Sequence, residues 1–189
     1  MKALPLIVFG LAALAQWAAP VAQIWTHENT LSHGTLVKLK CAAPDPYDPL
    51  RGRFLAVRPE QQHVEVPKGV EIESGTSMYG VLTTGEDGMA TITSLSAAPP
   101  AEGAHIRVKV SSSYDNKAYI IWPFERFYIN EKLAPEADQW FTENIRTEQG
   151  IIAEVRVRDG RAVLADLSLG GRPFREILKE RVSGAGGAR

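Results

Sequence analysis

Hydrophobic residues are densest in the first part of the chain. From Ala3 to Trp25 no side chain is charged. At a rise of about 1.5 Å per residue this segment forms a helix of roughly 34 Å, enough to cross the ~30 Å hydrocarbon core of a bilayer. Lys2 lies before the segment, and no Lys or Arg follows it until Lys38. The positive-inside rule therefore predicts one transmembrane helix with a cytoplasmic N-terminus and an exported C-terminal part.

The same segment also has the parts of a cleavable signal peptide. Lys2 is a short basic region, residues 4–12 form an apolar core, and Ala13-Leu14-Ala15 is a small-x-small cleavage site. Cleavage after Ala15 would release a soluble exported protein. The apolar residues continue past Ala15 as far as Trp25 and favour an uncleaved anchor. Both interpretations export the rest of the chain.

From residue 35 onward, short segments alternate between apolar and polar positions and are interrupted by Gly, Pro and Asp. In segment 35–41, Val37, Leu39 and Cys41 share one face, and polar residues occupy most of the other. The same style of alternation recurs at 63–66, 78–84, 89–95, 105–110 and 117–122. This spacing predicts a mainly β fold, a small antiparallel sandwich or barrel-like domain.

The last strand pair is predicted over residues 151–169. A two-residue turn at Asp159-Gly160 would pair Arg156 with Val163 and so place basic and apolar side chains on one face. A three-residue turn with a bulge at Gly160 pairs Val155 with Val163 instead and closes an apolar stripe. We therefore predict the bulged turn.

Segment 83–92 allows a similar turn. Gly88 can take the positive φ that such a turn needs. The resulting register is predicted to set Leu82 opposite Ile92.

One short helix is predicted among the strands, over residues 135–148. Pro135 suits the first turn, and the acidic side chains of Glu136 and Asp138 complement the helix dipole there. An apolar face recurs at three- and four-residue spacing and consists of Ala137, Trp140, Phe141 and Ile145. We expect this face to pack into the core.

Composition agrees with one anchor and one domain. The 189 residues include 21 basic and 22 acidic side chains, a net charge of −1, and 44% are hydrophobic. This balance argues against a nucleic-acid-binding protein. The expected organisation is a signal-anchor helix at 1–25, a juxtamembrane linker at 26–34, the exported β-rich domain at 35–182 and a disordered Gly-rich tail at 183–189.

The chain contains no recognisable catalytic, metal-binding or cofactor-binding motif. The four histidines lack the spacing of helical metal ligands, and the single cysteine, Cys41, excludes a multi-Cys zinc site. Cys41 is best explained as a small buried residue of a strand. Phosphate-binding, dinucleotide-binding and nucleophile-elbow motifs are also missing. We expect no catalytic residue, cofactor or metal.

Two segments are candidates for binding. The first, 43–54, combines prolines with acidic residues, which indicates a stiff structural turn or else a binding loop. Its candidate positions are Asp45, Asp48, Pro49, Arg51, Gly52 and Phe54. In the second, 120–132, aromatic residues surround a Glu-Arg pair, as in a charged recognition point or an edge strand with inward-facing aromatics. Its candidate positions are Glu125, Arg126, Phe127, Tyr128 and Glu131.

A third segment, the predicted hairpin, carries three basic residues on its polar face. Arg156, Arg158 and Arg161 are expected to form a solvated face, and the alternative is contact with an acidic partner or lipid headgroups. The near-neutral charge of the domain argues against strong electrostatic binding to lipid.

The sequence resembles the bacterial GDYXXLXY family of short proteins. The resemblance rests on the N-terminal apolar helix and on "ENTLSHGTLVKLKCAAPDPYDPLRGRFLAV", "FERFYINEKLAPEAD" and "VRVRDGRAVLADLSLGGRPF". The motif that names the family is degraded: Gly52 stands, but Arg53, Phe54, Val57 and Pro59 replace its other positions. The resemblance implies a membrane-anchored exported domain, often encoded beside or fused with multi-spanning membrane proteins. No catalytic residue is assigned to the family.

These observations predict a non-enzymatic module at the bacterial inner (cytoplasmic) membrane, with its domain in the periplasm. Its expected role is that of an accessory or binding partner of a multi-spanning membrane protein. One alternative is a soluble exported peptide- or glycan-binding domain after signal cleavage. Another is a signal-peptidase-like hydrolase, because Thr30-Leu31 with Gly34 and Arg51-Gly52 resemble segments of those enzymes. A Ser nucleophile paired with a Lys base is not evident in the sequence.

Overall fold

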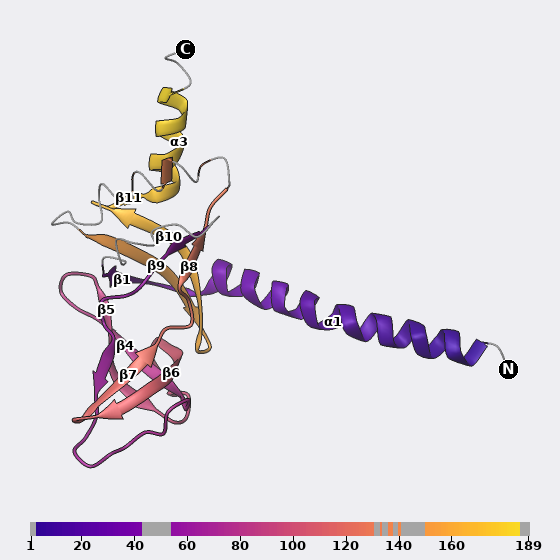
Figure 1. Cartoon of the computed structure of the whole chain (residues 1–189), viewed down its shortest axis with the longest axis horizontal. Coiled ribbons are helices and arrows are strands. Elements are labelled where there is room, and N and C mark those ends of the chain that lie inside the picture. Colours follow the sequence, from indigo (N-terminus) through magenta and orange to yellow (C-terminus); the bar gives the residue numbers. More distant parts are fainter. Residues whose placement is uncertain are drawn as a thin grey trace.

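The computed structural model describes residues 3–42, 54–130, 133, 136–137, 140 and 150–185. A long N-terminal helix, α1 (Ala3–His33), projects sideways from a β domain (Figure 1). A second helix, α3 (Phe174–Ala185), lies at one end of that domain. The described residues are mostly β, with antiparallel pairing within each sheet, so the predicted fold class is confirmed.

A four-stranded sheet lies in the middle of the domain, next to the base of α1 (Figure 1). Its strand order is β1 (Thr35–Cys41), β9 (Ile151–Arg158), β10 (Arg161–Leu169) and β11 (Arg172–Pro173). The apolar face predicted for 35–41 is buried, because Val37 and Leu39 pair with Val155 and Ala153 of β9 on the core side.

A five-stranded sheet forms the other end of the domain, opposite α3 (Figure 1). Its order is β3 (His63–Glu65), β7 (Lys117–Ile121), β6 (His105–Tyr114), β4 (Ser77–Thr84) and β5 (Ala90–Ser96). Leu82 pairs with Ile92 across β4 and β5, as predicted, and Gly88 has a φ of 75° in the connecting turn.

A third, two-stranded sheet pairs β2 (Phe54–Ala56) with β8 (Arg126–Tyr128). Leu55 and Phe127 face each other there and are buried. The Phe127 ring lies 6.0 Å from the ring of Phe174, the first residue of α3. The small sheet therefore connects α3 to the core.

Helix α3 was not predicted, although its sequence has a helical pattern. Pro173 precedes it, Glu176 lies in its first turn, and Phe174 and Leu178 are buried at a four-residue spacing. It extends to Ala185, past the expected start of the tail at residue 183, and residues 186–189 lie outside the described residues.

The helix predicted at 135–148 lies largely outside the described residues. Glu136, Ala137 and Trp140 are helical. Ala137 and Trp140 are buried, and the Trp140 ring lies 4.5 Å from that of Phe174. The expected inward direction of this face is confirmed at these two positions.

The segment expected to be a linker, 26–34, is helical as far as His33 and continuous with the apolar part of α1. No Gly or Pro interrupts it before Gly34, and the Thr26 and Thr30 hydroxyls donate to carbonyl oxygens four residues earlier. Gly34 ends the helix and donates its amide to the Thr30 carbonyl at 2.9 Å.

The predicted register of the last hairpin is wrong. Arg156 pairs with Val163, and Asp159 and Gly160 form a two-residue turn with φ values of 50° and 75°, as a type I′ turn requires. The extra residue that corrects the apolar stripe lies further along β10, between Leu164 and Asp166. Local alternation could not locate this bulge, because it does not show which side of the hairpin another element covers.

Candidate functional site

The end of α1 packs against the hairpin face that carries Arg156 and Val163. Arg156 donates from Nη1 to the carbonyl oxygen of Gly34 at 3.0 Å, and Arg158 donates from Nη1 to Asn29 Oδ1 at 3.3 Å. Hydrogen bonds from charged donors contribute about 1.5–3 kcal/mol when partly buried. A face with basic and apolar residues is therefore stable here. The end of α1 covers its apolar part and accepts hydrogen bonds from its arginines.

A groove of about 740 Å³ lies where α1 meets both larger sheets; we call it the junction groove. One wall is the end of α1, which contributes Ala22, Gln23, Thr26, His27 and Thr30. Three basic side chains line it, Arg107 and Lys109 from β6 and Arg161 from β10. The remaining lining is largely apolar and includes Val108, Ile121, Trp122, Pro123 and Val163. None of the residues that line this groove is acidic.

Both sheets contribute to the groove because a parallel bridge joins them at the hairpin turn. Ile106 bridges Gly160, and the Arg107 amide donates to the Gly160 carbonyl at 2.7 Å. Arg161 follows Gly160 directly, so it lies next to Arg107 although the two belong to different sheets.

A second groove, of about 540 Å³, adjoins the first; we call it the aromatic groove. Residues of β8 and the segment before it line one side, and Leu164 and Arg175 line the other. The two grooves share His27, Pro123, Ala162 and Val163, so they meet at the end of α1.

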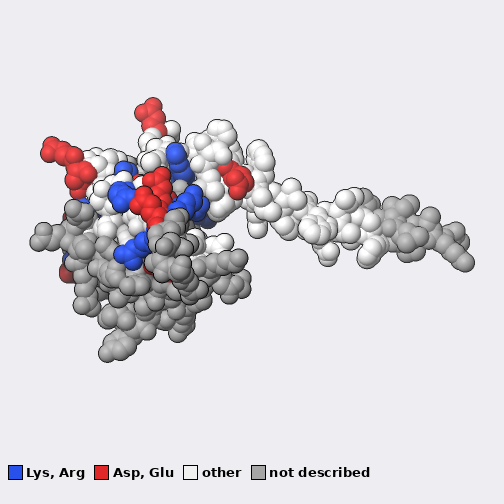
Figure 2. Space-filling model, turned by 90° about the horizontal axis from the view of Figure 1, so that it is seen from above, with Lys and Arg blue, Asp and Glu red and all other residues white. Residues whose placement is uncertain are grey.

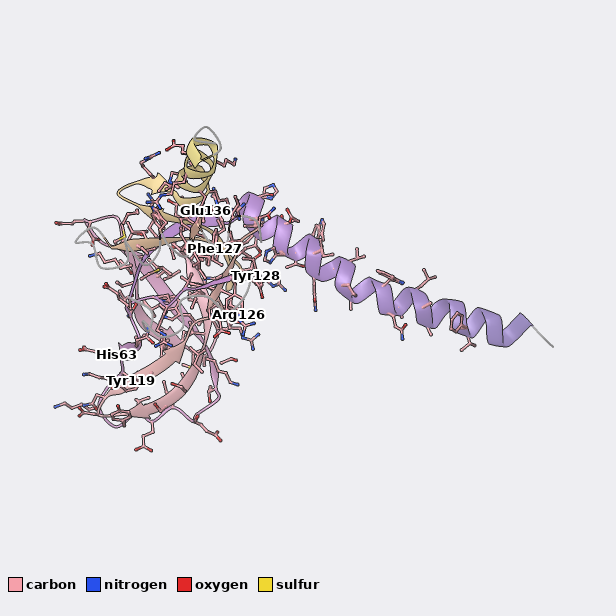
Figure 3. All side chains as sticks on the ribbon, turned by 45° about the horizontal axis from the view of Figure 1, so that its top comes forward. His63, Tyr119, Arg126, Phe127, Tyr128 and Glu136 are labelled. Carbon is pink, nitrogen blue, oxygen red and sulfur yellow. The ribbon has the colours of Figure 1, made fainter. Side chains whose placement is uncertain are left out.

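Four predicted binding positions come together around β2 and β8. Phe54 pairs with Tyr128, with ring centroids 6.0 Å apart, and the guanidinium of Arg126 lies 4.8 Å from the Phe54 ring centroid. Arg126 also forms an ion pair with Glu125, Nε to Oε1, at 3.5 Å. Tyr128 is 69% exposed. Figure 3 shows Arg126 and Tyr128 on the α1 side of the domain, away from His63 and Tyr119.

Phe127, another predicted binding position, is a core residue. It is 4% exposed and packs against Phe174, and the guanidinium of Arg175 lies 5.4 Å from its ring centroid. The remaining candidates, Asp45, Asp48, Pro49, Arg51, Gly52 and Glu131, lie outside the described residues.

Two described positions of the degraded motif, Val57 and Pro59, are structural. Val57 is buried, and Pro59 is fully buried and bridges Cys41 of β1. Val57 donates its amide to Glu125 next to β8, and Pro59 joins this segment to the middle sheet.

Sequence reasoning missed Arg107 and Lys109. A signal was available, because "HIRVKV" places a basic residue at every second position of a strand and hence on one face. Which face meets α1 is not encoded locally, so the residues looked like ordinary solvated positions.

Two residues considered for chemistry have unreactive surroundings. Burial raises the pKa of the Cys41 thiol to about 12, well above its usual value. Thr30 is 2% exposed, and its hydroxyl donates to the Thr26 carbonyl at 2.9 Å, so it is not placed as a nucleophile. Among the residues that the structure describes, no three His, Cys, Asp or Glu side chains lie close enough to hold a metal ion.

The described part of α1 from Val8 to His33 is long and apolar enough to cross a membrane. Figure 2 shows the described length of the helix without charged side chains until it approaches the domain. A membrane span and a signal sequence near the N-terminus both fit this composition.

Comparison with protein families identifies a match. The family model described as "GDYXXLXY protein" matches residues 16–167, which is most of the chain and includes the residues of both grooves except Arg175. No functionally curated protein and no solved structure matches the chain. The named motif is degraded here, but the match extends from the middle of α1 into β10. The chain belongs to the GDYXXLXY protein family.

Proposed function

We propose that the chain is a single-pass protein of the bacterial inner membrane whose exported domain binds a membrane-embedded protein partner without catalysing a reaction. The N-terminus lies in the cytoplasm and the β domain on the outer side. The observation that carries this proposal is an exposed aromatic and charged surface next to the end of an apolar helix.

Anchoring is supported by the side chains of α1 beyond the candidate cleavage site at Ala15. Trp17, Val21, Ile24 and Trp25 are between 59% and 72% exposed. Soluble proteins rarely expose such a continuous apolar surface on a helix, because contact with water is unfavourable. A bilayer covers these residues if the helix is retained.

Partner binding is supported by the composition of the aromatic groove. Tyr128 and Arg126 line the groove and are exposed, and both pack against the half-buried ring of Phe54 beside it. Tyr and Arg are the residue types most often found at the energetic centres of protein interfaces, and aromatic side chains are enriched across such interfaces. Because the groove also includes His27 of α1, the exported loops of a neighbouring membrane protein are within reach.

Photo-crosslinking in intact membranes tests the partner. The photoreactive residue benzoyl-phenylalanine replaces Tyr128, and in a matched control it replaces Tyr114, which is 60% exposed. Tyr114 is the last residue of β6. The bridge to Gly160 at the grooves is made by Ile106, near the start of the same strand, so Tyr114 lies far from them. We expect a crosslinked membrane protein from Tyr128 and none from Tyr114. Equal products from both positions, or none from either, would count against the proposal.

The soluble alternative makes a different prediction about the mature protein. Cleavage after Ala15 shortens the chain and releases it from membranes during alkaline carbonate extraction. We expect an uncleaved mass and retention in the pellet. A mature chain that begins at Gln16 and appears in the supernatant would replace the anchored function with a soluble binding domain.

A further inference from the structure

We infer that the junction groove binds the phosphate-bearing headgroup of an anionic phospholipid in the leaflet next to the exported domain. This inference rests on the proposed anchoring of α1, but not on the protein partner. It assigns a ligand class to a surface separate from the Tyr128 cluster.

The charge of the groove calls for an anionic ligand. Arg107, Lys109 and Arg161 all line it, and the residues that the structure describes provide no ion-pair partner for any of them. The acidic residue nearest to Arg161 in sequence, Asp159, forms its ion pair with Arg158 instead, Oδ2 to Nε, at 3.6 Å. The whole chain has a net charge of −1, so these cations form a local basic site on a nearly neutral protein.

The register of the strands concentrates this charge. Lys109 pairs directly with Ser77 on one side and with Ile121 on the other. Arg107 is two residues earlier on β6 and therefore on the same face. The bridge between Ile106 and Gly160 brings Arg161 to the same place from the other sheet. A single phosphate can thus contact cations from both sheets.

The apolar wall distinguishes a lipid from a free anion. Ile121 is 51% exposed beside Lys109, and Pro123, Val163 and Ala22 continue the apolar lining. A soluble phosphate has no apolar surface to bury against this wall. The glycerol backbone and first acyl carbons of a phospholipid do bury apolar surface there. The volume of about 740 Å³ is within the range of small-molecule sites.

The position of the groove along α1 matches the headgroup layer. The uncharged segment ends at Trp25, whose 70% exposed side chain suits the membrane interface. Thr26, His27 and Thr30 line the groove and lie about 1.5–8 Å beyond Trp25 along the helix axis, at ~1.5 Å per residue. The polar layer on each side of the hydrocarbon core is about 5–8 Å thick. The basic residues of the groove therefore lie at the depth of the lipid phosphates.

Native mass spectrometry of the full chain in lipid nanodiscs tests this inference. The nanodiscs contain phosphatidylcholine alone or with phosphatidylglycerol, and retained lipid is counted on the released protein. The test variant is R107Q/K109Q/R161Q. The control, R58Q/K68Q/K117Q, removes the same charge at cations outside the groove. We expect the wild type and the control to retain phosphatidylglycerol selectively, and the test variant to bind it on the order of a hundredfold more weakly.

A second variant separates charge from folding. R107K/R161K keeps every positive charge and is expected to retain most of the selectivity, and circular dichroism melts confirm that all variants fold. Equal losses in the test and control variants would indicate general surface electrostatics and overturn the inference. Equal retention of phosphatidylcholine and phosphatidylglycerol by the wild type would also overturn it.

Two soluble competitors identify the source of the anion. Glycerol 3-phosphate that binds as tightly as the lipid would make the groove a site for a free phosphate compound. An acidic peptide that displaces phosphatidylglycerol and binds without it would assign the groove to a protein. Incorporation into the nanodisc reports on anchoring independently, so a failure of anchoring is distinct from a failure of lipid selectivity.

Discussion

Three arginines on one face of the β9–β10 hairpin have different roles. Arg156 and Arg158 donate to the end of α1, whereas Arg161 lines the junction groove. All three occupy the same face of the hairpin, and only the element that packs against each of them differs. At the scale of single residues, the role of an arginine therefore depends on its burial and on its hydrogen-bond partners, and not on residue type alone. Cys41 and Asp166 show the same principle for ionisation.

Cys41 is expected to be unreactive in the folded protein. Burial disfavours the thiolate and raises the pKa of the thiol to about 12. Iodoacetamide at about pH 8 should leave Cys41 unmodified in the native protein and alkylate it fully in denaturant. Rapid modification of the native chain, measured by intact mass, would mean that β1 opens or that the thiol is exposed.

Asp166 is expected to reduce stability at neutral pH. Burial raises the pKa of its carboxyl above the ordinary value, although the Leu167 amide and Arg175 lower it. Stability from such a group is complete below the unfolded pKa of about 4 and is lost as pH rises through the folded pKa. Asp166→Asn, which keeps an acceptor for the Leu167 amide, should therefore melt at the same or a higher temperature than the wild type at pH 7. The difference should vanish near pH 3.

Asp87→Asn provides a control of opposite sign. The Met89 amide, which donates to Asp87 Oδ1 at 3.0 Å, and Lys40 lower the pKa of this carboxyl. Its contribution is present above the unfolded pKa and is lost as pH falls through the folded pKa. The variant should melt below the wild type at pH 7, with the gap closing in acid. Thermal melts of both variants across this range check the two signs together.

At the scale of elements, the alternation of residues located most strands but not their partners. Segment 35–41 is a strand with the expected buried face, and Leu82 lies opposite Ile92. Both depend on neighbours within one strand or one turn. The short strands β2 and β8 lack a pattern of their own and exist because they pair with each other. The last hairpin adopts the register that looked unfavourable, because α1 covers one of its faces.

Gly160→Ala is expected to destabilise the domain more than a matched glycine substitution. Gly160 has a φ of 75°, and an added Cβ would lie 2.9 Å from Tyr79 Cε1. Gly69 has a φ of 81° and nothing within 4 Å of an added Cβ. Both variants should lose about 1–2 kcal/mol from backbone strain, and Gly160→Ala should lose further stability from the contact with Tyr79. Urea unfolding measures the difference, and equal losses would show that Tyr79 moves aside freely.

At the scale of the whole molecule, α1 is part of the domain and not a tether to it. Thr30 is buried, and two arginines of β9 bond to the last turns of the helix. With α1 in a membrane, as proposed, the protein fold would set the orientation of the domain relative to that membrane. This fixed orientation places both grooves beside the helix, where a membrane partner and a lipid headgroup would be found.

The double variant R156Q/R158Q is expected to loosen this junction. Loss of two hydrogen bonds from charged donors should lower the local opening free energy by about 3 kcal/mol, twice the lower end of the range for one such bond, because both bonds are only partly buried. Amide hydrogen exchange of residues 26–34 should become faster, while that of β4 and β6 stays unchanged. Arg172→Gln, which removes the 2.7 Å ion pair with Glu180 in α3, serves as the control and should leave exchange in 26–34 unchanged. Unchanged exchange in the double variant would show that apolar packing alone holds the junction.

The sequence by itself determined the features that depend on near neighbours: the apolar helix, the faces of most strands and the turn at Gly88. Family membership also follows from it, because it rests on sequence similarity. Only the tertiary structure decided the register of the last hairpin and the assembly of the junction groove. Arg107 and Arg161 are far apart in the chain, and they meet because the bridge at Gly160 joins two sheets. Local patterns record which residues share a face, but the element that covers the face comes from distant sequence.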